Sequence, residues 1–317
     1  MMNNFEKLLP GVKQNIRLSD YSTFQIGGLA SYFFKVVNKE DLIKALRAAE
    51  ASGLPFFILG GGSNVLFPNE GYKGLIIKIS NRDIKLKDNY LLVQAGVPLA
   101  EVLKKTKESG LTGFEWSAGI YGTLGGAIRG NAGSFGKSMA DVVKKVQVFD
   151  YKDKKIKEFL NKDCQFKYRE SVFKKNNNLI ILEALLEFKK GNKDLIEQTI
   201  NKNLAYKKEH QPLNYPCAGS IFKNYEIKKG DEDLFKNFGR LKEFKKSSFI
   251  PAGVLIEEIG LKGKRIGDAK FSEKHANMIV NLHRAKSQEV LRLIEMAKER
   301  VKSFFGLELE EEIVILK

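Results

Sequence analysis

The chain has 317 residues, with 54 Lys and Arg against 38 Asp and Glu, which gives a formal net charge of +16. Hydrophobic residues make up 43%, charged residues 29% and aromatic residues 10%, a balance that excludes disorder, collagen and coiled coil as the main state. With two cysteines and no apolar run long enough to span a bilayer, we expect a cytoplasmic protein without disulfides or membrane insertion.

The positive charge has two interpretations: attraction of anionic partners, or a lysine-rich solvated surface. The basic residues are spread along the chain and form no run of five or more. We therefore favour the solvated surface and expect no nucleic-acid partner.

The first 190 residues are predicted to form a mixed α/β unit. Asn38 is a candidate helix cap and Gly53 a stop, which predicts a helix between them, followed by strands at 55–59 and 75–79. The further elements predicted here are a strand from 90, a helix from Pro98 to Gly110, and strands at 146–150, 164–173 and 179–188.

A helix predicted over 193–208 leads to a proline-containing turn at 211–216, which is a plausible domain boundary. The charged, weakly patterned segment 226–250 is interpreted as an exposed insertion. A long helix is predicted from Ser287 to Phe305. The residues of its apolar stripe, which we expect in the core, are Val290, Leu291, Ile294, Ala297, Val301 and Phe304.

Two glycine-rich loops are candidate anion sites. GGGSN at 60–64 follows a predicted strand, but Val65 breaks the dinucleotide fingerprint, and alone such a loop is more often a tight turn. GIYGTLGGAIRGNAGSFG at 119–136 has too many glycines for a simple turn. Together the loops suit a long ligand with a diphosphate in the middle. The candidate cofactor residues are Gly60, Gly61, Gly62, Ser63, Asn64, Gly119, Gly122, Thr123, Gly125, Gly126, Asn131 and Gly133.

Several segments resemble one family in the same order along the chain. They are FILGGGSN (57–64), the loop at 119–136, CQFKYRESVFK (164–174), QPLNYPCAGSIFKN (211–224) and the segment 252–281. The chain resembles the UDP-N-acetylenolpyruvoylglucosamine reductases, in their shorter subtype. The YRxS and AGSxFKN motifs are the most specific parts of this resemblance.

The resemblance implies an α+β fold: a two-subdomain FAD-binding fold of the vanillyl-alcohol-oxidase type and a C-terminal α+β substrate domain. The implied parts are FAD subdomains at 1–80 and 81–205, a UDP-sugar domain at 206–305 and a C-terminal strand with a catalytic acid at 306–317. It also implies FAD, NADPH as co-substrate and reduction of UDP-N-acetylglucosamine enolpyruvate. Because neither glycine loop contains His or Cys, we expect the FAD to be bound without a covalent bond, and we expect a monomer. Flavin N5 would pass hydride to the enolpyruvyl C3, and an acid would protonate C2.

By motif position, Arg169 would be the catalytic arginine, Ser220 the proton donor and Glu312 a second acid-base residue. The substrate-binding residues implied are Tyr168, Lys223 and Asn224. An arginine can hold the substrate carboxylate bidentately and stabilise the enolate, whereas a serine needs a relay, for which Lys223 or Glu312 could serve.

Several points stay open in the sequence. Strand parity does not separate Glu312 from Glu308 and Glu310, and Tyr121, Gln25 and Tyr225 depart from the family pattern. The three histidines have no metal-ligand spacing, so no metal is expected. The alternatives are a FAD-dependent alcohol oxidase of the same fold class and, more distantly, a basic nucleic-acid-binding protein.

Overall fold

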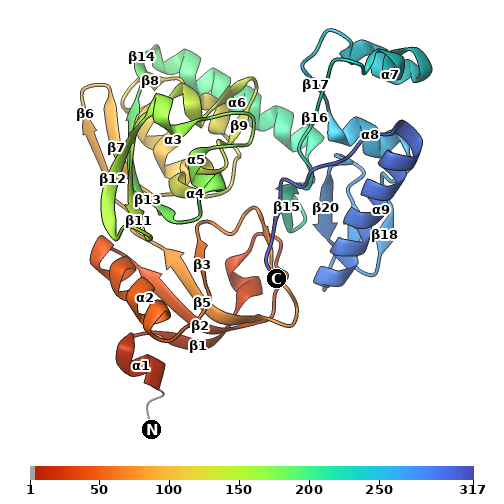
Figure 1. The fold of residues 1–317 in the computed structure, drawn as a ribbon. Coiled ribbons are helices and arrows are strands. Elements are labelled where there is room, and N and C mark those ends of the chain that lie inside the picture. Colours follow the sequence, from red (N-terminus) through yellow and green to blue (C-terminus); the bar gives the residue numbers. More distant parts are fainter. Residues whose placement is uncertain (1–3) are drawn as a thin grey trace. The chain divides into compact units, whose positions relative to one another are not determined.

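The computed structural model describes residues 4–317 and divides into two compact units, each with its own hydrophobic core. Unit 1 comprises the residues up to 16 together with 29–62 and 72–207, and unit 2 comprises 17–28, 63–71 and 208–317. Helices occur with both parallel and antiparallel sheets, which confirms the predicted α+β class (Figure 1). Within 4–317, no helix combines the length and apolarity needed to cross a membrane.

The first sheet of unit 1 has the order β1-β2-β5-β3 and is parallel across β2, β5 and β3, with α2 packed on it (Figure 1). Its elements are α1 (Asn4–Leu8), β1 (Lys13–Arg17), β2 (Leu29–Val36), α2 (Lys39–Ala51), β3 (Phe56–Leu59) and β5 (Tyr72–Ile79). Asn38 caps α2 as predicted, because its side chain accepts the N–H of Asp41 at 2.8 Å. The parallel strands end at one edge, where the loop after β3 begins.

The second sheet of unit 1 is antiparallel with the order β12-β11-β13-β7-β6, and one hydrophobic core joins it to the first sheet. Its strands are β6 (Ile84–Lys87), β7 (Tyr90–Gln94), β11 (Val143–Asp150), β12 (Lys155–Leu160) and β13 (Leu179–Glu187). The other elements are α3 (Leu99–Glu108), β8 (Leu111–Thr112), η2 (Glu115–Ser117), α4 (Leu124–Arg129), β9 (Gly133–Ser134), β10 (Lys137–Ser138), η3 (Met139–Asp141), η4 (Asn161–Cys164), α5 (Val172–Lys175), β14 (Lys189–Lys190) and α6 (Lys193–His210).

Unit 2 contains an antiparallel sheet of order β15-β20-β19-β18 with α9 packed on β18 and β19. Near the C-terminus, β21 pairs in parallel with β4. The elements are η1 (Leu18–Tyr21), β4 (Val65–Leu66), β15 (Cys217–Ser220), β16 (Tyr225–Glu226), α7 (Glu232–Asn237), η5 (Gly239–Phe244), β17 (Phe249–Ile250), α8 (Ala252–Glu258), β18 (Arg265–Ile266), β19 (Ala269–Phe271), β20 (Met278–Asn281), α9 (Ser287–Phe305) and β21 (Val314–Ile315).

The strand predicted at 164–173 is wrong. The segment consists of the end of η4, a tight turn and the start of α5. Gln165 and Arg169 have φ angles of +49° and +54°, which a β-strand does not allow. The apparent alternation of polar and apolar residues therefore comes from a turn that buries Cys164 and Phe173.

Two details of unit 2 also differ from the sequence prediction. The segment 226–250 is not simply an exposed insertion, because it forms α7 and η5 and buries Leu234, Phe235 and Leu241 in the core. Helix α9 has the predicted limits, but Phe304 is 53% exposed and Phe305 is buried in its place. Val301 and Phe305 are four positions apart and therefore lie on the same face of the helix, which is the face that packs in the core.

Candidate active site

The first glycine loop follows β3 at the carboxyl edge of the parallel sheet and packs against the second loop. A Cβ on Gly60 would lie 2.8 Å from Thr123 Oγ1, and one on Gly61 would lie 2.7 Å from Gly122 Cα. Gly62 has a φ of +69°. Glycine is therefore required here by the close approach of two loops as well as by backbone conformation.

The second loop carries a buried hydroxyl that is unpaired among residues 4–317. Thr123 precedes α4, yet its Oγ1 makes no capping hydrogen bond and has no other partner. Gly125 packs directly on Ala95, whose carbonyl accepts the Gly125 N–H at 2.9 Å. Gly126 has room for a side chain, because a Cβ there would lie 3.7 Å from Thr123 Oγ1.

These features fit a cofactor with a diphosphate. Backbone at two glycine loops can approach an anion without side-chain interference, and Gly119 and Gly122, with φ of +72° and +137°, let the second loop turn. A phosphate oxygen is also the kind of acceptor that an unpaired buried hydroxyl such as that of Thr123 requires.

The end of the second loop is tied to the turn that carries Arg169. Asn131, with φ +42°, donates from Nδ2 to the Lys167 carbonyl at 2.8 Å and accepts the Ala140 N–H at 3.0 Å. The Gly133 carbonyl accepts a hydrogen bond from Arg169 Nη2 at 3.1 Å. Asn131 and Gly133 thus join the glycine loop to the arginine within unit 1.

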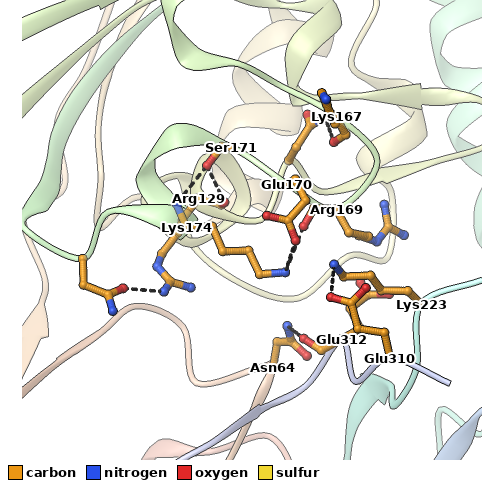
Figure 2. A network of polar contacts seen from close by, with 12 residues as sticks. Asn64, Arg129, Lys167, Arg169, Glu170, Ser171, Lys174, Lys223, Glu310 and Glu312 are labelled. Atoms are coloured by element: carbon orange, nitrogen blue, oxygen red, sulfur yellow. Dashed lines mark hydrogen bonds and ion pairs between the residues drawn. The ribbon is translucent and has the colours of Figure 1, made fainter. Parts of the chain in front are cut away.

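Arg169 lies in a strained turn that several contacts hold. Its φ of +54° is unusual for a residue with a side chain, and Lys167 and Glu170 form a backbone bridge around it. Lys174 Nζ donates to the Arg169 carbonyl at 3.0 Å and pairs with Glu170 at 3.2 Å (Figure 2). The guanidinium carbon lies 5.2 Å from the centre of the Tyr168 ring. The turn therefore fixes the arginine side chain beside an aromatic ring.

In unit 2, Ser220 is the last residue of β15, where the strand leaves regular pairing. It lies opposite Met278 of β20, a bulge interrupts the register after Cys217, and Gly219 has φ +74°. Asn277 accepts the Phe222 N–H at 2.9 Å and donates to the Phe222 carbonyl at 2.8 Å. This buried amide fixes the chain two residues beyond the serine.

The other motif residues of this segment also have defined partners. Lys223 is buried, and its Nζ lies 2.5 Å from Glu310 Oε1. Asn224 Oδ1 accepts the N–H of Ala252, the first residue of α8, at 3.2 Å. Lys223 is therefore joined to the C-terminal segment, and Asn224 to a helix of the same unit.

The C-terminal segment lies along the residues that follow Ser220. The Glu312 N–H donates to the Ile221 carbonyl at 2.8 Å, and Glu311 forms an antiparallel bridge with Phe222. Asn64, from the first loop motif, donates to the Glu312 carbonyl at 3.0 Å (Figure 2). Ser63 and Asn64 thus belong to unit 2, and the structure brings Asn64 and Glu312 together there.

The acids near Glu312 pair with lysines. The pairs are Glu308 with Lys302 at 2.9 Å, Glu310 with Lys223 at 2.5 Å, and Glu311 with Lys298 at 2.8 Å. The hydrogen bond from Lys302 lowers the pKa of Glu308.

Sequence reasoning missed one charged residue next to the first glycine loop. Lys78, on β5, is half-buried and donates to the Gly60 carbonyl. A lysine inside the apolar run LIIKI was the available signal. Within the described part of the chain, no group of three or more His, Cys, Asp and Glu residues could hold a metal ion.

Two family models match the chain. An FAD binding domain model matches residues 30–159, and a model for the C-terminal domain of UDP-N-acetylenolpyruvoylglucosamine reductase matches 211–316. Lys78 and the loop residues Gly60–Asn64 and Gly119–Gly133 lie in the first match, and Ser220, Lys223, Asn224 and Glu312 lie in the second.

Curated proteins named UDP-N-acetylenolpyruvoylglucosamine reductase match nearly the whole chain. The protein of Anoxybacillus flavithermus is 37% identical over 307 residues, which cover 96% of this chain and 94% of the relative. That of Prochlorococcus marinus is 38% identical over 304 residues, 95% of each chain. The crystal structure of the Thermus caldophilus reductase has a TM-score of 0.76 at 30% identity and covers 96% of this chain and 99% of that one.

Proposed function

The chain belongs to the UDP-N-acetylenolpyruvoylglucosamine reductase family, and on this basis we propose which of its residues carry out the reaction. The enzyme reduces the enolpyruvyl ether of UDP-N-acetylglucosamine to UDP-N-acetylmuramate in peptidoglycan precursor synthesis, with NADPH as co-substrate. FAD, when bound, supplies the hydride that reaches C3 of the enolpyruvyl group. The match at 211–316 favours this reductase over an alcohol oxidase with the same FAD fold.

Arg169 binds the substrate carboxylate in this proposal. Its planar guanidinium can make two parallel hydrogen bonds to a carboxylate and stabilise the negative charge that develops when hydride adds. The strained turn and the Gly133 carbonyl orient the side chain before substrate arrives. Tyr168, Lys223 and Asn224 are proposed to bind the remainder of the substrate.

Ser220 donates the proton to C2, and Glu312 replenishes it. The observation that carries this assignment is the hydrogen bond from the Glu312 N–H to the Ile221 carbonyl, which places Glu312 beside the residue that follows Ser220. Lys223 was the other relay considered, but its ammonium is held by Glu310 at 2.5 Å. We therefore favour Glu312.

The proposed domain organisation divides the chain into four parts. Residues 1–80 and 81–205 would form two FAD-binding subdomains, 206–305 the UDP-sugar domain and 306–317 the segment with the catalytic acid. FAD would be held without a covalent bond, because neither glycine loop contains His or Cys. A monomer in the cytoplasm is the simplest assembly, and the two cysteines are free thiols.

The test separates the two half-reactions with Ser220→Ala. NADPH should still reduce the bound flavin at nearly the normal rate, while reoxidation by the enolpyruvyl sugar should slow by about 10²–10⁴-fold, the usual contribution of a general acid. Stopped-flow absorbance at the flavin band follows each step, and retained flavin controls for integrity. Slow reduction with normal reoxidation would move the acid elsewhere and assign the AGSIFKN loop to nicotinamide binding.

A further inference from the structure

The ammonium group of Lys78 contacts the backbone of the first glycine loop. It lies near the end of β5 opposite Leu59, the last residue of β3, and it donates to the carbonyl of Gly60, the next residue of the chain. Two positive charges act on it: that of Arg82 and that of Lys35, which is its register partner on β2. Burial and these two charges lower the pKa of Lys78 to about 8. A cation kept in such an unfavourable place calls for an explanation.

The contact fixes the direction of the loop's peptide groups. In a trans peptide the carbonyl of one residue and the N–H of the next point in opposite directions, and no cis peptide occurs in the described residues. Because the Gly60 carbonyl points to Lys78, the Gly61 N–H points away from it. The Gly61 N–H donates to no backbone acceptor among residues 4–317, and Gly61 is partly exposed. This N–H is therefore available to an anion.

We propose that Lys78 is a positioning residue for the cofactor: by holding the Gly60 carbonyl, it aims the Gly61 N–H at the FAD diphosphate. This inference rests on the assignment of the glycine loops to FAD. Lys78 does not touch the phosphates in this role. Its positive charge adds a long-range attraction for a dianion.

The experiment measures FAD binding to flavin-free protein by quenching of flavin fluorescence. Lys78→Met should weaken FAD binding by about 10- to 100-fold, the effect of losing one hydrogen bond to a charged group. Lys78→Arg should restore most of the affinity, because it keeps a cationic donor. Lys35→Met is the matched control, since Lys35 is the exposed partner of Lys78 in the β2–β5 register, and it should change binding less than threefold.

Thermal unfolding and pH dependence separate the positioning role from a structural role, and the results expected for positioning are these. Removing a partly buried ammonium should leave the melting temperature of the flavin-free protein unchanged or higher, because the desolvation cost disappears. FAD affinity of the wild type should fall as pH rises through about 8, where Lys78 loses its proton, whereas that of Lys78→Arg should stay level. Burial also lowers the pKa of Lys207 to about 8. Because Lys207 is present in both proteins, a pH dependence of FAD affinity that occurs in the wild type and not in Lys78→Arg comes from Lys78.

The outcomes distinguish this inference from the assignment of the site. Unchanged FAD affinity in Lys78→Met would overturn the positioning role and leave the FAD assignment intact. Loss of affinity together with a lower melting temperature, or loss of folded protein, would also overturn it, as evidence of a structural role. A wild-type protein that binds no FAD would instead contradict the glycine-loop assignment itself.

Discussion

The two glycine loops of unit 1 and the Ser220–Glu312 region of unit 2 are built in different ways. In the loops, the backbone of Gly61 packs on that of Gly122 and Gly60 packs on Thr123 Oγ1, so the important property of both glycines is that they lack a Cβ. Around Ser220, side chains have the defining contacts, such as the amide of Asn277 on Phe222 and the ion pair of Lys223 with Glu310. A site made of backbone is sensitive to added volume, whereas a site made of side chains is sensitive to lost functional groups.

The side-chain region gives the largest expected effect. Glu312→Gln should slow flavin reoxidation by the enolpyruvyl sugar by about 10²-fold or more, because a positioned acid-base group is removed. Glu308→Gln and Glu311→Gln are matched controls in the same segment, and each should stay within about threefold of the wild type, since their partly exposed ion pairs with Lys302 and Lys298 contribute little. Single-turnover reoxidation measures all three variants. Equal rates would remove Glu312 from the mechanism.

Added volume tests the backbone region. Gly61→Ala should weaken FAD binding by about 10- to 100-fold, because its Cβ would lie 2.7 Å from Gly122 Cα and the two loops must separate. Gly130→Ala is the control, since Gly130 is not a candidate cofactor residue and its Cβ would meet the Gly126 carbonyl oxygen at an ordinary 3.6 Å. FAD titration of the flavin-free proteins gives both affinities. If the two variants behaved alike, the contact between the loops would not shape the FAD site.

A smaller change in the loop region tests the unpaired hydroxyl of Thr123. Thr123→Val keeps the shape of the side chain and removes the oxygen, so FAD affinity should fall by about 5- to 10-fold, or about 1 kcal/mol. The flavin-free protein should be as stable as the wild type or more stable, because a buried polar atom without a partner is removed. Fluorescence titration and thermal unfolding check the two halves. A loss of stability with unchanged affinity would make this hydroxyl a structural group.

Ionic strength should give the smallest effect and separate local from long-range electrostatics. Capture of NADPH and the UDP-sugar should slow by a few-fold between about 0.02 and 0.3 M salt if the +16 charge steers these anions. FAD affinity should change less, because the N–H groups of a packed loop act at contact distance. Second-order rates and titrations at both salt levels provide the comparison. Rates independent of salt would leave the net charge without a role in capture.

Much of the fold follows from local signals. The cap at Asn38 and the stop at Gly53 set the limits of α2, and helical periodicity set those of α9. The turn around Arg169 could not be predicted, because its positive φ is maintained by Lys174, Gly133 and the bridge between Lys167 and Glu170. A residue pattern of period two carries no information on such contacts.

The family followed from the sequence, because the YRxS and AGSxFKN motifs are contiguous and specific in residue type and spacing. The glycine loops, Arg169, Ser220 and Glu312 are sequence predictions that rest on motif position. The tertiary structure was needed to identify the lysine partners of Glu308, Glu310 and Glu311, because Lys223 follows β15 and Lys298 and Lys302 lie on α9. It also revealed Lys78 under Gly60 and the contact of Gly61 with Gly122. These contacts join residues that are 18 and 61 positions apart in the chain, and only chain packing brings them within bonding distance.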